Sequence, residues 1–112
     1  MNLRTADAPG LVAFIHRMVT SHGSRVLNAG PFEIVELAGF FWYHAADPVT
    51  LGGPFPSLEL LTRSEGRRRY PESGAEEVDY EVFEWAATFF RVERDGDHGV
   101  RAYASFEEAR RG

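Results

Sequence analysis

The stretch FEIVELAGFFWYHA, residues 32–45, determines whether the middle of this chain is predicted to be two strands or a helix. Its β-branched and aromatic residues are the types that are enriched in strands. Gly39 interrupts the run as a bulge or as the end of a short hairpin loop. We therefore expect two neighbouring strands, Phe32–Leu37 and Phe40–Ala45.

The same stretch also fits a helix that starts at Pro31 and ends before Asp47, because proline suits the first position of a helix. Four residues would then share one face of this helix: Phe32, Val35, Gly39 and Trp42. The density of aromatic residues favours the two strands over this helix.

The segments on either side predict a helix, a loop and a hairpin. Residues 7–22 have apolar side chains at helical spacing, with Asp7 as a capping residue at the start and Gly23 at the end. Residues 47–57 hold three prolines and two glycines, which are typical of a loop. Residues 57–71 are expected to form a hairpin that turns at Ser64-Glu65-Gly66.

The last third of the chain predicts a helix, a second hairpin and a final helix. Ser73 and Glu76 form a capping box that favours a helix over residues 76–87, with a long bent strand as the alternative. In residues 88–94 and 100–104, apolar side chains alternate with other residues, as in the two strands of a hairpin. A second capping box, at Ser105, predicts a short helix over residues 106–111. We find no internal repeat.

These elements predict an α+β fold in which residues 1–112 form a single domain. We expect the N-terminal helix to pack on an antiparallel sheet of about five to six strands. Short inserted and C-terminal helices complete this arrangement. A chain of this length buries enough surface to fold without disulfide bonds or a structural metal.

Composition excludes several classes of function. Cysteine and lysine are absent, which excludes disulfides, thiolate nucleophiles, Schiff-base chemistry and the lysine of a phosphate-binding P-loop. The four histidines have no spacing typical of a metal site, so we expect no metal and no cofactor. No apolar segment approaches the length of a membrane span or a signal peptide, so we expect a cytoplasmic location.

The formal net charge of −5 indicates the kind of partner. Acidity disfavours binding to nucleic acid and to anionic membranes, and it suits a basic protein partner. The arginine-only composition is typical of a GC-rich genome, so we expect a bacterial origin. The sequence is compatible with a monomer or a homodimer.

The segment EEVDYEVFEW is the first candidate site. On a helix, Glu77, Glu81 and Glu84 would form an acidic stripe beside Tyr80 and Trp85. Acidic residues around aromatic anchors are typical of docking surfaces. We therefore expect a non-enzymatic protein that inhibits or chaperones a basic partner, as immunity proteins and antitoxins do. A solvated helix face is the alternative.

The aromatic run provides the second candidate site. Trp42, Tyr43 and His44 could form the wall of a pocket with Phe55 in its lid, and His44 could act as an acid or base. The chain would then be a small enzyme or ligand-binding domain. A core strand covered on both faces is the simpler interpretation of the same residues.

The arginines at positions 67–69, which precede Tyr70, provide a third candidate site. Arginine beside an aromatic residue suits stacking on single-stranded nucleic acid. The acidic residues that follow make internal salt bridges the favoured interpretation of this cluster.

Overall fold

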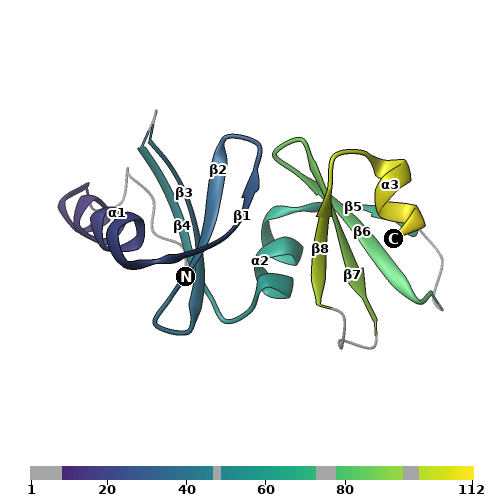
Figure 1. The fold of residues 1–112 in the computed structure, drawn as a ribbon, viewed down its shortest axis with the longest axis horizontal. Helices are drawn as coiled ribbons and strands as arrows, with labels where there is room; N and C mark the ends of the chain where they lie inside the picture. Colours follow the sequence, from purple (N-terminus) through teal and green to yellow (C-terminus); the bar gives the residue numbers. More distant parts are fainter. Residues whose placement is uncertain (1–8, 47–48, 73–77, 95–98) are drawn as a thin grey trace. The chain divides into compact units, whose positions relative to one another are not determined.

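The computed structural model describes residues 9–46, 49–72, 78–94 and 99–112. The chain divides into two compact units, Met1–Ser57 and Leu58–Gly112 (Figure 1). Each unit contains a four-stranded antiparallel sheet in which strands adjacent in sequence are adjacent in space. The predicted α+β class is confirmed. The predicted single sheet of five to six strands is corrected to two sheets of four.

The first unit is a helix followed by a four-stranded meander. Its elements are α1 (Pro9–His22), β1 (Ser24–Ala29), β2 (Phe32–Leu37), β3 (Phe40–Ala46) and β4 (Val49–Phe55). Helix α1 packs on the sheet through Ile15 and Val19, which meet the buried side chains of Val35 and Leu51. The predicted N-terminal helix is thus confirmed from Pro9 onward, whereas its capping residue Asp7 lies outside the described residues.

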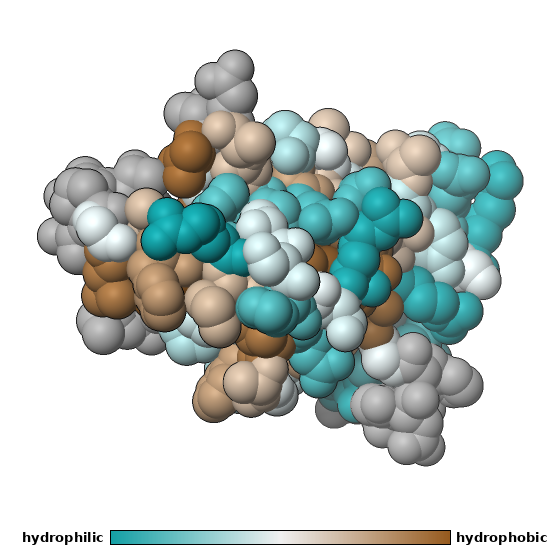
Figure 2. Space-filling view, turned by 60° about the vertical axis from the view of Figure 1, so that its left-hand side comes forward, coloured by the Kyte–Doolittle hydropathy of each residue, from teal (hydrophilic) through white to brown (hydrophobic). Residues whose placement is uncertain are grey.

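A face of α1 next to the one that packs on the sheet exposes large apolar side chains. Leu11, Phe14 and Met18 recur at helical spacing and are all exposed. Figure 2, which brings the first unit forward, shows apolar surface among polar surface. In the described residues, no helix is long and apolar enough to cross a membrane.

The stretch at residues 32–45 forms the predicted pair of strands, and the helix alternative is wrong. Ala38 and Gly39 make the turn between β2 and β3, with φ angles of 56° and 82°. Positive φ at both central residues is the geometry of the tight hairpin turns that match strand twist. The predicted loop at residues 47–57 is also corrected, because β4 occupies much of it. Strand β4 lies at an edge of its sheet, where proline is tolerated.

The second unit repeats the helix and meander and adds a helix. Its elements are α2 (Leu58–Glu65), β5 (Arg67–Tyr70), β6 (Tyr80–Trp85), β7 (Thr88–Glu93), β8 (Val100–Tyr103) and α3 (Phe106–Arg111). The predicted hairpin of β7 and β8 is confirmed. So is the C-terminal helix, where the Glu108 N–H donates to Ser105 Oγ at 3.1 Å.

Two predictions for this unit are wrong. The first strand of the predicted hairpin at residues 57–71 is helix α2, which buries Leu61 and Thr62. The helix predicted over residues 76–87 is replaced by strand β6 where the structure describes it, so the inserted helix is α2. The capping box at Ser73 lies outside the described residues. Pairing with β7 overrides the local helix signal, because it gives Val82 and Phe83 buried positions in a sheet.

The two units are repeats of one module, contrary to our expectation. Residues 32–64 align with residues 80–112 without a gap, and in this alignment β2 corresponds to β6 and α2 to α3. Identical residues recur at equivalent positions: Glu33 and Glu81, Glu36 and Glu84, Ala38 and Ala86, Phe41 and Phe89, Ser57 and Ser105, Glu59 and Glu107, Arg63 and Arg111. The segments SHGSR (21–25) and SEGRR (64–68) also align with each other where α1 and α2 end, at an offset of 43 rather than 48 residues.

The same local structure recurs at these equivalent positions. Gly23 and Gly66 follow the two helices, and their N–H groups donate to Val19 and Thr62 at 3.0 and 2.8 Å. A Cβ at Gly23 would lie 2.9 Å from the side chain of Val35, and one at Gly66 would lie 3.0 Å from that of Phe83. Val35 and Phe83 are themselves equivalent in the alignment.

An ion pair and a strand irregularity are repeated as well. Arg25 lies 3.7 Å from Glu33, and Arg68 lies 3.8 Å from Glu81. The pairing of β1 with β2 shifts register just after Arg25, and that of β5 with β6 just after Arg68. A register shift at equivalent positions of both units indicates a feature of the module rather than an accident of packing. The chain is therefore a tandem array of helix-and-four-strand modules.

Candidate functional site

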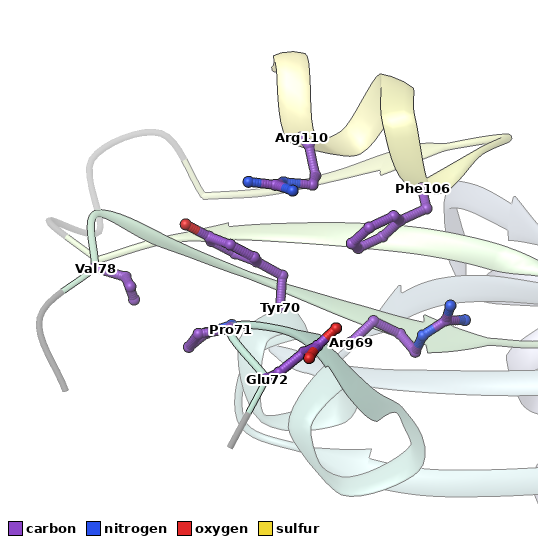
Figure 3. A pocket seen from close by; sticks show the side chains of 7 residues that line it. All are labelled: Arg69, Tyr70, Pro71, Glu72, Val78, Phe106 and Arg110. Carbon is purple, nitrogen blue, oxygen red and sulfur yellow. The ribbon is translucent and has the colours of Figure 1, made fainter. Parts of the chain in front are cut away.

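A hollow of about 380 Å³ opens in the second unit, beside the end of β5 and helix α3 (Figure 3). This volume lies in the range of ligand pockets in proteins. Seven residues line it: Arg69, Tyr70, Pro71, Glu72, Val78, Phe106 and Arg110. Its wall therefore combines aromatic rings with two guanidinium groups and one carboxylate.

Two aromatic rings, those of Tyr70 and Phe106, line the hollow, and each contacts a further ring of the same unit. The rings of Tyr70 and Tyr80 stack with centroids 4.8 Å apart and an interplanar angle of 23°. Phe106, from α3, lies 6.1 Å from the ring of Phe89 on β7. Figure 3 shows Phe106 and Arg110 reaching from α3 toward Tyr70. The site is thus assembled from segments that are far apart in the sequence.

Arg110 is the cation best placed to meet a ligand. Its guanidinium lies 4.3 Å from the centroid of the Tyr70 ring, and its Nε–H donates to the Tyr80 hydroxyl at 3.4 Å. This hydrogen bond raises the pKa of Arg110, so the side chain keeps its charge. Among the described residues Arg110 contacts rings and a phenol rather than a carboxylate. Its charge is therefore available to an anion.

Two further arginines belong to the same network, but each has an acidic partner. Arg69 pairs with Glu84, and its guanidinium lies 5.4 Å from the ring of Phe106. Arg91 pairs with Glu93 and donates to the carbonyls of Ala109 and Arg110 at 2.9 and 3.0 Å. Arg91 thereby holds the end of α3 against the sheet and positions the side chains that α3 presents.

The first repeat lacks this chemistry at the equivalent positions. There the alignments place apolar or uncharged residues: Val26 for Arg69, Leu27 for Tyr70, Phe32 for Tyr80, Tyr43 for Arg91, Leu58 for Phe106 and Thr62 for Arg110. The common module does not need the arginines in order to fold, because the first unit forms the same sheet without them. These arginines therefore distinguish the second unit.

The predicted acidic stripe is not brought together by the structure. Glu81 and Glu84 are three apart on strand β6 and therefore lie on opposite faces of the sheet. Glu81 accepts a hydrogen bond from Arg63 at 2.5 Å, which raises the pKa of Arg63. Glu84 pairs with Arg69. Glu77 lies outside the described residues, so docking through these three carboxylates stays a prediction.

The two aromatic residues predicted beside that stripe have separate environments. Tyr80 joins the arginine network of the hollow, where the guanidinium of Arg91 lies 3.7 Å from its ring centroid. The ring of Trp85 is tilted against Phe90, at a centroid distance of 6.3 Å.

The predicted pocket of the first unit is divided between two faces of its sheet. Trp42 and His44 lie under α1, where the rings of His16 and His44 meet edge to face at 5.3 Å. His44 is 9% exposed, and its Nε2 lies 3.0 Å from Glu33 Oε1. Tyr43 points to the other face, where it stacks on Phe55 at 6.3 Å. The four residues do not form one pocket wall, and a chemical role for His44 stays a prediction.

Comparison with protein-family models, with curated proteins and with solved structures gave no match. The candidate site thus depends on its own geometry. In the part of the chain that the structure describes, no group of three or more acidic or histidine side chains is arranged to hold a metal ion.

Sequence reasoning considered Arg69 and Tyr70 as a surface for single-stranded nucleic acid and did not predict this hollow. Arg69 and Tyr70 were singled out, and the favoured internal salt bridge of Arg69 is present. Phe106 and Arg110 were not singled out, because only the packing of α3 brings them to Tyr70. Alignment of the two repeats would have found them, since charged or aromatic residues replace smaller uncharged ones there.

Proposed function

We propose that this chain is a non-enzymatic binding protein whose second unit binds an oxyanion, a carboxylate or a phosphate, carried on a flat apolar group. One observation carries this proposal: the Arg110 guanidinium lies on the Tyr70 ring beside a hollow, with no carboxylate partner among the described residues.

The chemistry of the wall supports an oxyanion. Guanidinium is planar, binds carboxylate or phosphate through two parallel hydrogen bonds and is weakly hydrated. The rings of Tyr70 and Phe106 hold it by cation–π attraction, which orients the group before a ligand arrives. An apolar group attached to the oxyanion would cover the same rings, so both parts of the ligand find a matching surface.

A basic protein partner, as for an immunity protein or an antitoxin, has weaker support. The net charge of −5 still favours it. Two of the three carboxylates assigned to its docking surface, those of Glu81 and Glu84, are engaged by arginines of their own unit. The basic partner therefore stays an untested prediction.

Isothermal titration calorimetry with benzoate and phenyl phosphate tests the proposal. We expect weak binding of both probes, and a loss of roughly tenfold or more in affinity for Arg110→Gln, because a charged hydrogen bond contributes about 1.5–3 kcal/mol. Arg101→Gln is the matched control, since Arg101 is a half-exposed arginine of the same unit that pairs with Glu93. Equal affinities for the two variants, or no binding to the unmodified chain, would refute the proposal.

A further inference from the structure

The hollow has a neighbour along α3, and we call the two together the groove. A second hollow, of about 460 Å³, is lined by Tyr80, Phe106, Glu107, Arg110 and Arg111. Phe106 and Arg110 line both hollows, so the two adjoin at these side chains. The groove therefore offers two places for a ligand on either side of one aromatic ring and one guanidinium.

From this geometry we infer that the ligand is an acidic peptide segment of a partner protein, lying across both hollows. The inference rests on the proposed function and extends it from an oxyanion to an extended chain. In this arrangement one carboxylate of the peptide binds Arg110, a second carboxylate binds Arg111, and an apolar side chain of the peptide packs on Phe106.

Charge along the groove supports two carboxylates. Arg111 is paired with Glu107 at 3.7 Å, and their side chains are 77% and 83% exposed. Exposed pairs of this kind contribute little to stability, so a peptide carboxylate can replace Glu107 as the partner of Arg111 at small cost. Arg69 adds a third guanidinium at the other end of the groove, against Glu84.

The same surface suits a peptide better than nucleic acid. Glu72 lines the first hollow and Glu107 the second, and both would repel a backbone that carries a negative charge on every unit. A peptide can place uncharged residues opposite these carboxylates and acidic residues opposite the arginines. Recognition of acidic motifs by arginine clusters is an established mode of peptide binding.

The test compares a long probe with a short one on the same variants. The long probe is the blocked peptide acetyl-Asp-Glu-Phe-Asp-Glu-Leu-amide, its control is the same peptide with Asn and Gln in place of the acids, and the short probe is benzoate. We expect the acidic peptide to bind at least tenfold more tightly than benzoate. We also expect Arg111→Gln to weaken the peptide severalfold while leaving benzoate unchanged, and Arg110→Gln to weaken both.

The outcomes separate this inference from the proposed function. The inference would be overturned if benzoate binding depends on Arg110 while the acidic peptide binds no more tightly than benzoate. It would also be overturned if the peptide binds the Arg111→Gln variant as tightly as the unmodified chain. In both cases the proposed function would still stand. No binding of either probe would overturn both. Tighter binding of a short oligothymidylate than of the acidic peptide would replace the peptide by nucleic acid. Melting temperatures close to that of the unmodified chain confirm that both variants are folded.

Discussion

At the scale of single residues, the two glycines that follow α1 and α2 show most directly how the repeated module is built. Gly23 and Gly66 lie where the backbone leaves a helix and turns into a strand, against the side chains of Val35 and Phe83. A Cβ at either position would also lie within about 2.6 Å of a helix carbonyl, 2.5 Å for Val19 and 2.6 Å for Thr62. Only glycine fits this approach without a shift of the backbone.

Alanine at these glycines should therefore destabilise the protein in the same way. We expect Gly23→Ala and Gly66→Ala each to lower the free energy of unfolding by roughly 1–3 kcal/mol, the usual effect of overpacking. Gly10→Ala is the control, because a Cβ there meets nothing within 4 Å and alanine favours the helix. Urea denaturation measures all three, and a neutral result at either glycine would show that its close packing is not as described.

The residue scale also explains why the site could be predicted only in part. Arg69 and Tyr70 adjoin in the sequence, so their pairing of charge and ring is visible there. Arg110 meets Tyr70 only because Arg91 bonds the last carbonyls of α3 and holds that helix on the sheet. No spacing rule connects these residues along the chain.

Among the helices and strands, those strands could be predicted that have both turn-forming residues between them and a strand-like pattern of apolar side chains. The hairpin of β2 and β3 has both, and so its bounds were predicted almost to the residue. Strand β6 was mistaken for a helix because Val78, Val82 and Trp85 recur at helical spacing while its pairing partner β7 is invisible to local pattern. Strand β4 was mistaken for a loop because it contains Gly52, Gly53 and Pro54, and proline is tolerated within a sheet only at an edge strand such as this one.

The turn between β2 and β3 is equivalent to the turn between β6 and β7, so exchanging alanine and glycine between them is a further test. The turn between β6 and β7 has Ala86 and Ala87 at φ angles of 53° and 60°, whereas the first repeat has Gly39 in place of Ala87. Alanine with positive φ is strained by roughly 1–2 kcal/mol, and glycine removes this strain at a smaller entropic cost. We expect Ala87→Gly to stabilise the protein by up to about 1 kcal/mol and Gly39→Ala to destabilise it by a similar amount. Thermal unfolding of both variants measures this, and shifts of the same sign would contradict it.

At the scale of the whole molecule, the tandem array raises the question of whether the units are independent. Each unit holds about half of the 112 residues, and domains of about 60 residues have marginal stability on their own. Modules in repeat proteins are generally stabilised as an array rather than singly. This supports the prediction of a single domain, which stays to be tested.

Hydrogen exchange provides that test. If the chain is a single cooperative domain, Gly66→Ala in the second unit should speed the exchange of core amides in β2 of the first unit, such as those of Ile34 and Val35, as much as those of β6. Unchanged protection in β2, with faster exchange confined to the second unit, would show two independent domains.

We propose that recognition belongs to the second unit, because the arginines of the network distinguish this unit from its repeat. The most direct measurement maps the backbone and arginine side-chain NMR signals of the whole chain during titration with the acidic peptide. We expect saturable shifts at Arg69, Tyr70, Phe106 and Arg110. We expect none at Val26 and Leu27, the counterparts of Arg69 and Tyr70 in the first unit, and none at His44. Shifts centred on His44 and Trp42, or the absence of any saturable shift, would contradict it.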